Sequence, residues 1–337
     1  MSERNERILV LGGTGAMGTY LVPLLAELGY RVDAVSLDRV ESGRPNLRYF
    51  TLDAMDRRTL KELLDMGPYD CVVDFMLYNT MQYAERFETL LGGCGHYVQL
   101  SSYRVYSDLE IPTRETSPRL LDVSEDREFL AAEDYSLYKA REENIVRASR
   151  FRNWTVVRPA ITYSKFRYQL VTLEAPILIR RAFEGKPVLL PESAMDVEAT
   201  MTWAGDVAKM FAGLVCNPAA MGECYSLCTA EHRPWRTVAE YYRDLAGLRY
   251  ETVPDEAYLS MQQWPSAAVY QLRYDRCLTR IMDNSKILAA ANLRQEELTP
   301  LYEGLRRELS ALPRDHVWPE TPVNAMLDDW FAARNRA

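Results

Sequence analysis

The chain has 337 residues, of which 47% are hydrophobic and 26% are charged. This is ordinary globular composition, which excludes a disordered, fibrous or coiled-coil protein. At roughly 150 residues per domain, the length predicts about two domains. The formal net charge of −8 argues against binding to nucleic acid, whose phosphates attract basic surfaces.

Cysteine content and hydropathy bear on the compartment. Six cysteines in a chain of this length do not form a disulfide framework, so we read them as reduced thiols. No run approaches the 18 apolar residues of a membrane helix, and the polar start is unlike a signal peptide. We therefore expect a soluble cytoplasmic protein. Cys224, Cys228 and His232 are spaced by fours, but no fourth ligand is near, so we expect no metal site.

Strands and helices alternate through the first half of the chain. Short apolar runs predict strands over residues 8–11, 31–36, 47–52, 71–75, 97–100 and 155–157. Apolar spacing of three and four predicts helices over residues 20–28, 57–64, 81–91 and 135–149, with Gly29 capping the first. This alternation predicts an α/β fold with a doubly wound parallel sheet. In the less regular second half, helices are expected over residues 175–183, 203–214, 234–245 and 300–309.

A glycine-rich turn joins the first strand to the first helix. Gly12, Gly15 and Gly18 have the spacing at which one glycine permits a tight turn, the next permits close approach of a pyrophosphate, and the last permits helix–strand packing. The free N–H groups of the helix N-terminus then face the phosphates. We therefore predict a Rossmann-type dinucleotide-binding domain over residues 1–165, with residues 200–228 returning to it. Residues 166–199 and 229–337 are expected to form a smaller, mainly helical substrate domain.

The end of the second strand determines which dinucleotide is bound. Asp38 favours NAD because a carboxylate there accepts a hydrogen bond from the ribose 2′-hydroxyl, whereas Ser36 and Arg39 suit the 2′-phosphate of NADP. NAD is slightly favoured. Asp53, after the third strand, has two interpretations: a contact to the adenine amine, or an N-cap of the following helix.

Tyr135 and Lys139 form a Tyr-x-x-x-Lys pair on one helix face. A free tyrosine has a pKa near 10, and a lysine ammonium one turn away would stabilise the phenolate that a base at neutral pH requires. The alternative is a solvated helix face made by Glu133, Asp134, Arg141 and Glu142. Tyr138 is a rival phenol, but no lysine stands four residues after it. Upstream, Ser102 follows a central strand at the end where doubly wound folds bind ligands.

These segments together resemble the extended short-chain dehydrogenase/reductases, the NAD-dependent nucleotide-sugar epimerase/dehydratase family. The similarity covers nearly the whole chain and rests on the segments 12–18, 101–106, 112–118, 135–143, 158–163, 203–208, 283–286 and 303–305. The resemblance implies that Ser102, Tyr135 and Lys139 are catalytic and that Lys139 also bonds the nicotinamide ribose. It implies cofactor contacts at Gly12, Gly15, Ala16, Met17, Gly18, Ser36, Asp38, Arg39, Asp53, Ala54, Phe75, Met76, Leu77, Lys139 and Pro159. Substrate contacts are implied at Ser102, Tyr103, Tyr135, Tyr163, Lys165 and Arg167.

The chain also departs from the family pattern. Asp74-Phe75-Met76-Leu77 stands where small residues usually line the cofactor, as in atypical members. Tyr103 and Arg104 follow Ser102 in place of the Asp-Glu pair of the dehydratases, which disfavours elimination of water. An arginine that often holds the nucleotide diphosphate is missing; Lys165, Arg167, Arg273 and Arg276 are candidate replacements, each read first as a surface charge.

Three functions follow. The first is a nucleotide-sugar 4-epimerase that works through a transient 4-keto intermediate and recycles NAD. The second is a reductase of a keto-sugar or other carbonyl that consumes NADPH. The third is a non-catalytic, nucleotide-binding regulatory protein. The resemblance further implies a homodimer, and no nucleic acid or membrane partner is expected.

Overall fold

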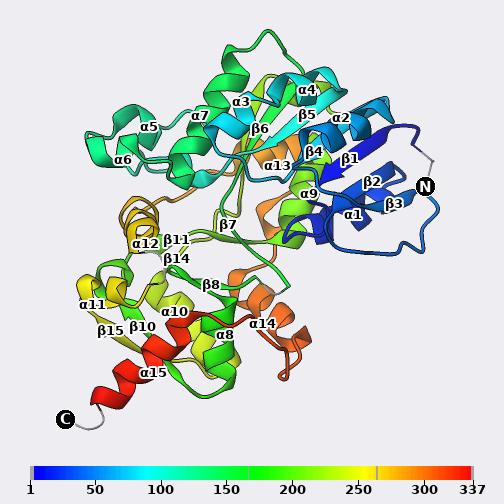
Figure 1. The fold of residues 1–337 in the computed structure, drawn as a ribbon. Coiled ribbons are helices and arrows are strands. Elements are labelled where there is room, and N and C mark those ends of the chain that lie inside the picture. Colours follow the sequence, from blue (N-terminus) through cyan, green and yellow to red (C-terminus); the bar gives the residue numbers. More distant parts are fainter. Residues whose placement is uncertain (1–3, 166, 263–264, 335–337) are drawn as a thin grey trace. The chain divides into compact units, whose positions relative to one another are not determined.

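The computed structural model describes residues 4–165, 167–262 and 265–334 (Figure 1). The chain divides into two compact units. The first comprises Met1–Thr162, Thr202–Ala230 and Met282–Leu298, and the second comprises Tyr163–Met201, Glu231–Ile281 and Thr299–Ala337. Strands β7 (Ile161–Tyr163) and β12 (Met201–Trp203) include two of the points at which the chain passes from one unit to the other.

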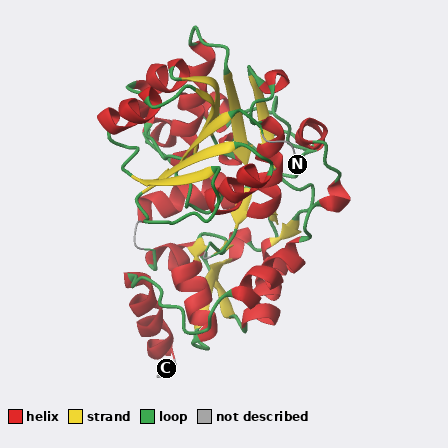
Figure 2. Ribbon diagram, turned by 90° about the vertical axis from the view of Figure 1, so that its right-hand side faces the viewer, coloured by secondary structure: helices red, strands yellow, loops and turns green. Residues whose placement is uncertain are grey.

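The first unit is built on a seven-stranded, wholly parallel sheet, whose strands are yellow in Figure 2. Its strand order is β13-β6-β5-β4-β1-β2-β3. The strands are β1 (Arg7–Leu11), β2 (Arg31–Ser36), β3 (Leu47–Thr51), β4 (Tyr69–Asp74), β5 (Cys94–Leu100), β6 (Trp154–Pro159) and β13 (Glu223–Leu227). The six strands expected from the sequence are confirmed, as is the doubly wound fold. The order reverses beside β1, so the β1 and β4 ends open the crevice where such sheets bind ligands.

Helices cover both faces of this sheet, because strands buried on both sides need two apolar layers. One core packs α1 (Gly18–Glu27), α9 (Ala204–Leu214) and α13 (Ser285–Ala291) against the sheet. The opposite core involves α2 (Arg57–Asp65), α3 (Thr80–Ala84), α4 (Phe87–Gly92) and α7 (Tyr135–Ala148). The unit also contains α5 (Leu120–Val123), α6 (Arg127–Ala131), η1 (Tyr103–Val105), η3 (Pro218–Ala220) and η5 (Gln295–Glu297).

The second unit is mainly helical, as expected. Its helices are α8 (Ala175–Phe183), α10 (Trp235–Ala246), α11 (Asp255–Ser260), α12 (Pro265–Gln271), α14 (Leu301–Ala311) and α15 (Pro322–Arg334), with η2 (Glu192–Ala194) and η4 (Leu272–Arg276). Its strands form three short pairs: β8 (Gln169–Leu170) with β9 (Leu173–Glu174), β10 (Pro187–Pro191) with β15 (Arg249–Val253), and β11 (Glu198–Ala199) with β14 (Arg233–Pro234). No helix in the described ranges is long and apolar enough to span a bilayer.

The structure corrects two expectations. The helix expected over residues 81–91 is two helices, because Arg86 interrupts the backbone ladder. Its guanidinium donates to the Gln82 carbonyl at 2.6 Å, and its own N–H turns to the Tyr83 carbonyl instead. The second correction concerns Met282–Leu298, which was expected in the substrate domain and instead belongs to the first unit. There Ile287 and Leu298 complete the core beneath α9.

Candidate functional site

The glycine turn after β1 is tightly packed except at one position. A Cβ on Gly18 would lie 2.6 Å from the carbonyl carbon of Gly13, and one on Gly13 would lie 2.8 Å from the Ala34 Cβ. Gly12 adopts a φ of +76°, which favours glycine. Gly15 is exposed, and its nearest neighbour to an added Cβ is at 3.4 Å. The turn is therefore a close-packed cradle whose open side, at Gly15, can receive a phosphate-bearing ligand.

The end of β2 is tied to this turn. Thr14 Oγ1 donates to Asp38 Oδ2 at 2.6 Å, and Ser36 Oγ accepts from the Asp38 amide at 3.1 Å. Asp38 therefore holds an exposed carboxylate beside the glycine turn, where a ribose hydroxyl can donate to it. Arg39 is exposed and makes only a loose ion pair with Glu41, at 3.9 Å. Asp53 accepts from the Met55 amide at 2.8 Å and so caps the turn after β3, whereas the N-cap of α2 is Asp56.

The bulky residues after β4 pack between the two cores and one side of the glycine turn. The Phe75 ring packs edge-on against Phe211 of α9, with centroids 5.2 Å apart, and belongs to the core on that face. Met76 joins the opposite core, and Leu77 is exposed. Both residues also line the turn itself, because a Cβ added to Gly12 would lie 3.2 Å from Phe75 Cβ and 3.6 Å from Met76 Sδ. They close the Gly12 side of the turn and leave the side at Gly15 open. The cradle at Gly12–Gly18 and the carboxylate at Asp38 fit a dinucleotide such as NAD. The structure places the other predicted cofactor residues as follows. Ala16 and Met17 lie just before α1, Ala54 is buried after β3, and Pro159 ends β6.

Two neighbouring serines at the end of β5 have different tasks. Ser101 donates to Glu143 at 2.5 Å inside the protein, so its hydroxyl is committed to the core. Ser102 caps η1 by accepting from the Arg104 amide at 3.2 Å, which leaves its own proton available to donate. Because η1 packs against α7, Ser102 is brought to the amino-terminal end of that helix.

Tyr135 begins α7, directly after the capping residue Asp134. The Arg104 guanidinium carbon lies 5.0 Å from the centre of the Tyr135 ring, and the same guanidinium pairs with Asp134 at 3.7 Å. The rival phenol, Tyr138, packs edge-on against Tyr135, with ring centroids 5.4 Å apart. Burial, together with the neighbouring Tyr135, raises the pKa of Tyr138 well above its ordinary value. Tyr138 therefore stays protonated, and Tyr135 is the better candidate for acid–base work.

Lys139 is buried with an acidic partner. Its ammonium donates to Glu142 Oε2 at 3.0 Å, and both side chains are 1% exposed. Glu142 was assigned to a solvated helix face in the alternative interpretation of this helix, and that assignment is wrong. A spacing of three from Lys139 was the only sequence signal that could have identified the pair. Asp74, at the end of β4, is also buried and interacts electrostatically with Lys139.

A second buried ion pair fixes α7 to the sheet. Glu143 receives hydrogen bonds from the Arg158 guanidinium at 2.6 and 2.8 Å, and from Ser101. Burial would raise the pKa of Glu143, but Arg158 and its other donors hold it below the ordinary value. Glu143 and Arg158 are the last residue of Tyr-x-x-x-Lys-x-x-x-Glu and the first of the Arg-Pro segment. The structure gives them a positioning role.

The predicted substrate contacts fall in different places. Ser102, Tyr103 and Tyr135 lie in the first unit, whereas Tyr163, Lys165 and Arg167 belong to the second. Tyr163 is fully buried against Gly304 of its own unit. Among the candidate replacements for the missing arginine, Arg276 is no surface charge, because it is buried and pairs with Asp275 at 3.0 Å. In the described part of the chain no cluster of His, Cys, Asp or Glu is placed to hold a metal, and His232 pairs with Glu198.

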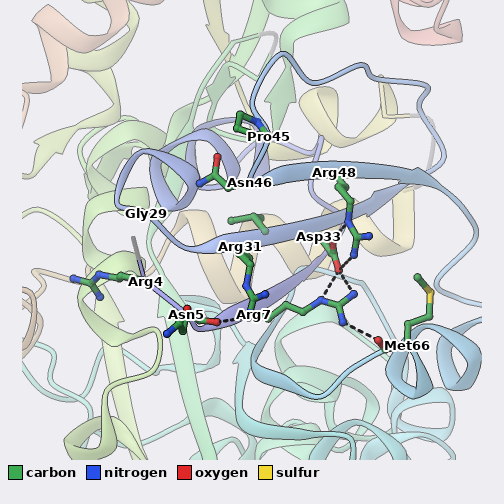
Figure 3. A pocket seen from close by; sticks show the side chains of 11 residues that line it. Arg4, Asn5, Arg7, Gly29, Arg31, Asp33, Pro45, Asn46, Arg48 and Met66 are labelled. Carbon is green, nitrogen blue, oxygen red and sulfur yellow. Dashed lines mark hydrogen bonds and ion pairs between the residues drawn. The ribbon is translucent and has the colours of Figure 1, made fainter. Parts of the chain in front are cut away.

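An arginine-lined pocket of about 1030 Å³ is shown in Figure 3. Its lining residues include those at the amino-terminal ends of β1, β2 and β3, whereas the glycine turn follows the carboxyl end of β1. Asp33 on β2 lies buried at the base of the pocket and accepts hydrogen bonds from Arg7, Arg48 and Tyr69. Burial would raise the pKa of Asp33, but these three donors lower it below the ordinary value. The cluster joins β1, β2 and β3 at their amino-terminal ends, so we assign it to stability.

Comparisons with known proteins show the family and the fold. Residues 8–228 match the family model described as the NAD dependent epimerase/dehydratase family. No curated protein matches the sequence significantly. Among solved structures, the epimerase Mth375 of Methanothermobacter thermautotrophicus is 16% identical, with a TM-score of 0.68, covering 98% of this chain and 95% of that one.

Two further structures have the same fold. UDP-glucose 4-epimerase of Thermotoga maritima, solved with UDP-glucose, is 16% identical with a TM-score of 0.67, over 90% of this chain and 97% of that one. dTDP-glucose 4,6-dehydratase of Bacillus anthracis, solved with NAD, is 17% identical with a TM-score of 0.67, over 90% and 96%. The family match spans well over half of the chain and includes the glycine turn, Ser102, Tyr135 and Lys139. The chain therefore belongs to the NAD-dependent epimerase/dehydratase family.

Proposed function

We propose that the protein is an NAD-dependent epimerase that inverts C4 of a nucleotide sugar through a 4-keto intermediate. The observation that carries the proposal is the setting of Tyr135. This phenol has a cation on its ring, Arg104, and a lysine one helical turn away. Ser102, two residues before Arg104, accepts from the Arg104 amide and keeps its hydroxyl proton as a donor. Such a set performs one reversible proton transfer at a hydroxyl-bearing carbon. Arg104, which stands where a dehydratase has an acid, is engaged with Asp134.

The residues act in a definite order. The chemistry that NAD supplies when bound is reversible hydride transfer. Tyr135, as phenolate, takes the proton of the sugar hydroxyl, and Arg104 and Lys139 favour that phenolate by their charge. Ser102 donates its proton to the same sugar oxygen and stabilises the negative charge that develops there. The keto-sugar then turns over and presents the other face of C4. As C4 is reduced on that face, Tyr135 returns the proton to the C4 oxygen.

A reductase that consumes NADPH is the second candidate, and the exposed Arg39 favours it. Its guanidinium could pair with a 2′-phosphate. Asp38 counts against it, because its carboxylate at the glycine turn would face that phosphate. The residues at the end of β2 therefore favour NAD that is recycled within each turnover.

The test is a screen of UDP- and dTDP-hexoses for the C4 epimer, run in ²H₂O without added reductant. The proposal expects the epimer to form with no deuterium at C4, because the hydride returns internally. Tyr135→Phe should lower kcat by about 10²- to 10⁴-fold, the usual contribution of general acid–base catalysis. Tyr138→Phe, one turn along the same helix, is the matched control and should retain most activity. Product formation only with added NADPH would favour the reductase, and bound nucleotide with no turnover would favour the regulatory protein.

A further inference from the structure

The buried partner of Lys139 has no role in the proton transfers proposed above. Glu142 is fully buried, and Lys139 is its one charged hydrogen-bond partner among the described residues. The Lys139 ammonium has three N–H donors, and its single hydrogen bond to a described residue goes to Glu142. The lysine that the proposed function requires at the dinucleotide is therefore held by a carboxylate inside the protein.

The hydrogen bonding around Glu142 suits a carboxyl that can be neutral. Its Oε1 atom is buried with no hydrogen-bond partner among the described residues, and the same is true of Oε1 of the neighbouring Gln99. Gln99 Nε2 reaches Glu142 Oε2 only at 3.4 Å. Protonation would supply an O–H donor to a cluster that holds an unpaired acceptor. Consistently, burial raises the pKa of Glu142 to about 7, despite the opposing effect of Lys139.

Burial also raises the pKa of the second buried carboxyl, Asp74, but hydrogen-bond donors and Lys139 oppose that effect, and Asp74 is better satisfied as an anion than Glu142. It accepts from the Tyr97 hydroxyl at 2.8 Å, from the Met76 amide at 2.9 Å and from the Tyr78 hydroxyl at 3.4 Å. Two carboxylates thus face one ammonium, and Glu142 is the one with fewer donors. If Glu142 lost its charge, one carboxylate, Asp74, would remain to balance the one ammonium, Lys139.

The remaining groups around the cluster do not titrate near neutral pH. Burial raises the pKa values of Tyr83 on α3, Tyr97 on β5 and Tyr138 on α7, so all three phenols stay neutral. Arg104 from η1 keeps its charge and is engaged with Tyr135 and Asp134. Among the described groups that face Lys139, Glu142 and Asp74 are thus the ones whose charge can change.

We propose that Glu142 is a positioning residue that holds the Lys139 ammonium when ionised and releases it when protonated, so that dinucleotide binding is coupled to proton uptake by Glu142. The inference rests on the proposed function, which places Lys139 at the dinucleotide. The direction in which pH changes the affinity for the dinucleotide follows from two effects. The ionised carboxylate competes for the lysine N–H donors, and its negative charge repels the negatively charged dinucleotide. Both effects disappear on protonation, so affinity should be highest at low pH.

The experiment measures the Kd of NADH by fluorescence from pH 6 to pH 8.5 on protein freed of co-purified dinucleotide. NADH is chosen because its nicotinamide ring carries no charge of its own. The wild-type Kd should rise above pH 7. The rise should approach tenfold per pH unit over the range in which Glu142 is ionised in the free protein and protonated in the complex. Calorimetry at pH 7.5 in two buffers of different ionisation enthalpy should show net proton uptake on binding, and this readout needs no variant.

Variants then locate the proton. Glu142→Gln should bind NADH at pH 8.5 about as tightly as the wild type does at pH 6, with a flat profile. Glu133→Gln should keep the wild-type profile; Glu133 is exposed and pairs with Arg141 near the start of the same helix. Asp74→Asn should keep the slope but move the rise in Kd to lower pH, because the Asp74 charge raises the pKa of Glu142. NADH binding with no pH dependence, no proton uptake, or an unchanged slope in Glu142→Gln would overturn this inference alone. Failure to bind NADH or NADPH at any pH would overturn the proposed function as well.

Discussion

At the residue scale, the glycines of one turn have separable tasks. Gly18 has no room for a side chain, because an added Cβ would sit 2.6 Å from the backbone of Gly13. A Cβ added to Gly15 would lie 3.4 Å from its nearest neighbour, so packing within the protein does not require a glycine there, and we propose that the ligand does. Gly18→Ala should therefore destabilise the fold by about 1–3 kcal/mol, as overpacking does.

Gly15→Ala should behave differently. Its melting temperature should stay near that of the wild type, while its affinity for NADH falls, because the methyl group occupies the open side of the cradle. Gly43→Ala is the control, since nothing lies within 4 Å of an added Cβ there. Thermal melts and NADH titrations of the three variants check this. Equal affinities of Gly15→Ala and Gly43→Ala for NADH would show that the dinucleotide does not bind at this turn.

At the scale of elements, the cluster around Asp33 ties the amino-terminal ends of β1 to β3. Asp33→Asn leaves Arg7 and Arg48 without their shared carboxylate. Hydrogen bonds to charged groups contribute about 1.5–3 kcal/mol, so unfolding free energy at pH 7 should fall by about 2 kcal/mol. Because the folded pKa of Asp33 is depressed, its contribution is present at neutral pH and is lost as the pH falls below about 4.

Urea unfolding at pH 7 and pH 3 measures both effects. The difference between Asp33→Asn and the wild type should be larger at pH 7 than at pH 3. Asp56→Asn, which keeps a capping residue at the exposed start of α2, serves as the control for removing a carboxylate. A difference that persists unchanged at pH 3 would show that the Asp33 charge does not stabilise the sheet.

The elements also show what the sequence could predict. Residues 31–36 and 175–183 are the observed bounds of β2 and α8, because apolar spacing and flanking turns determine such segments locally. The break at Arg86 was missed, since it depends on a guanidinium that takes a backbone carbonyl. Glu142 was missed for a similar reason. A glutamate between charged neighbours reads as exposed, and only contacts from β4 and β5 bury it.

At the scale of the whole molecule, the first unit is completed by a distant segment. Ile287 and Leu298 fill the core beside α9, so the first unit is not continuous in sequence. A chain ending at residue 230 would expose the apolar surface that these residues cover. Each buried side chain of this size contributes about 1.5–3 kcal/mol. We expect the 1–230 fragment to aggregate or melt well below the full chain in sedimentation and thermal unfolding; a fragment as stable as the full chain would contradict this.

The central claim is that the protein retains NAD and recycles it on a sugar hydroxyl. The most direct measurement is to denature the purified protein and identify any released dinucleotide by chromatography and mass. The account predicts close to one NAD per chain, released from the glycine turn and Asp38. Protein that releases no dinucleotide, and that afterwards binds neither NAD nor NADP, would contradict it.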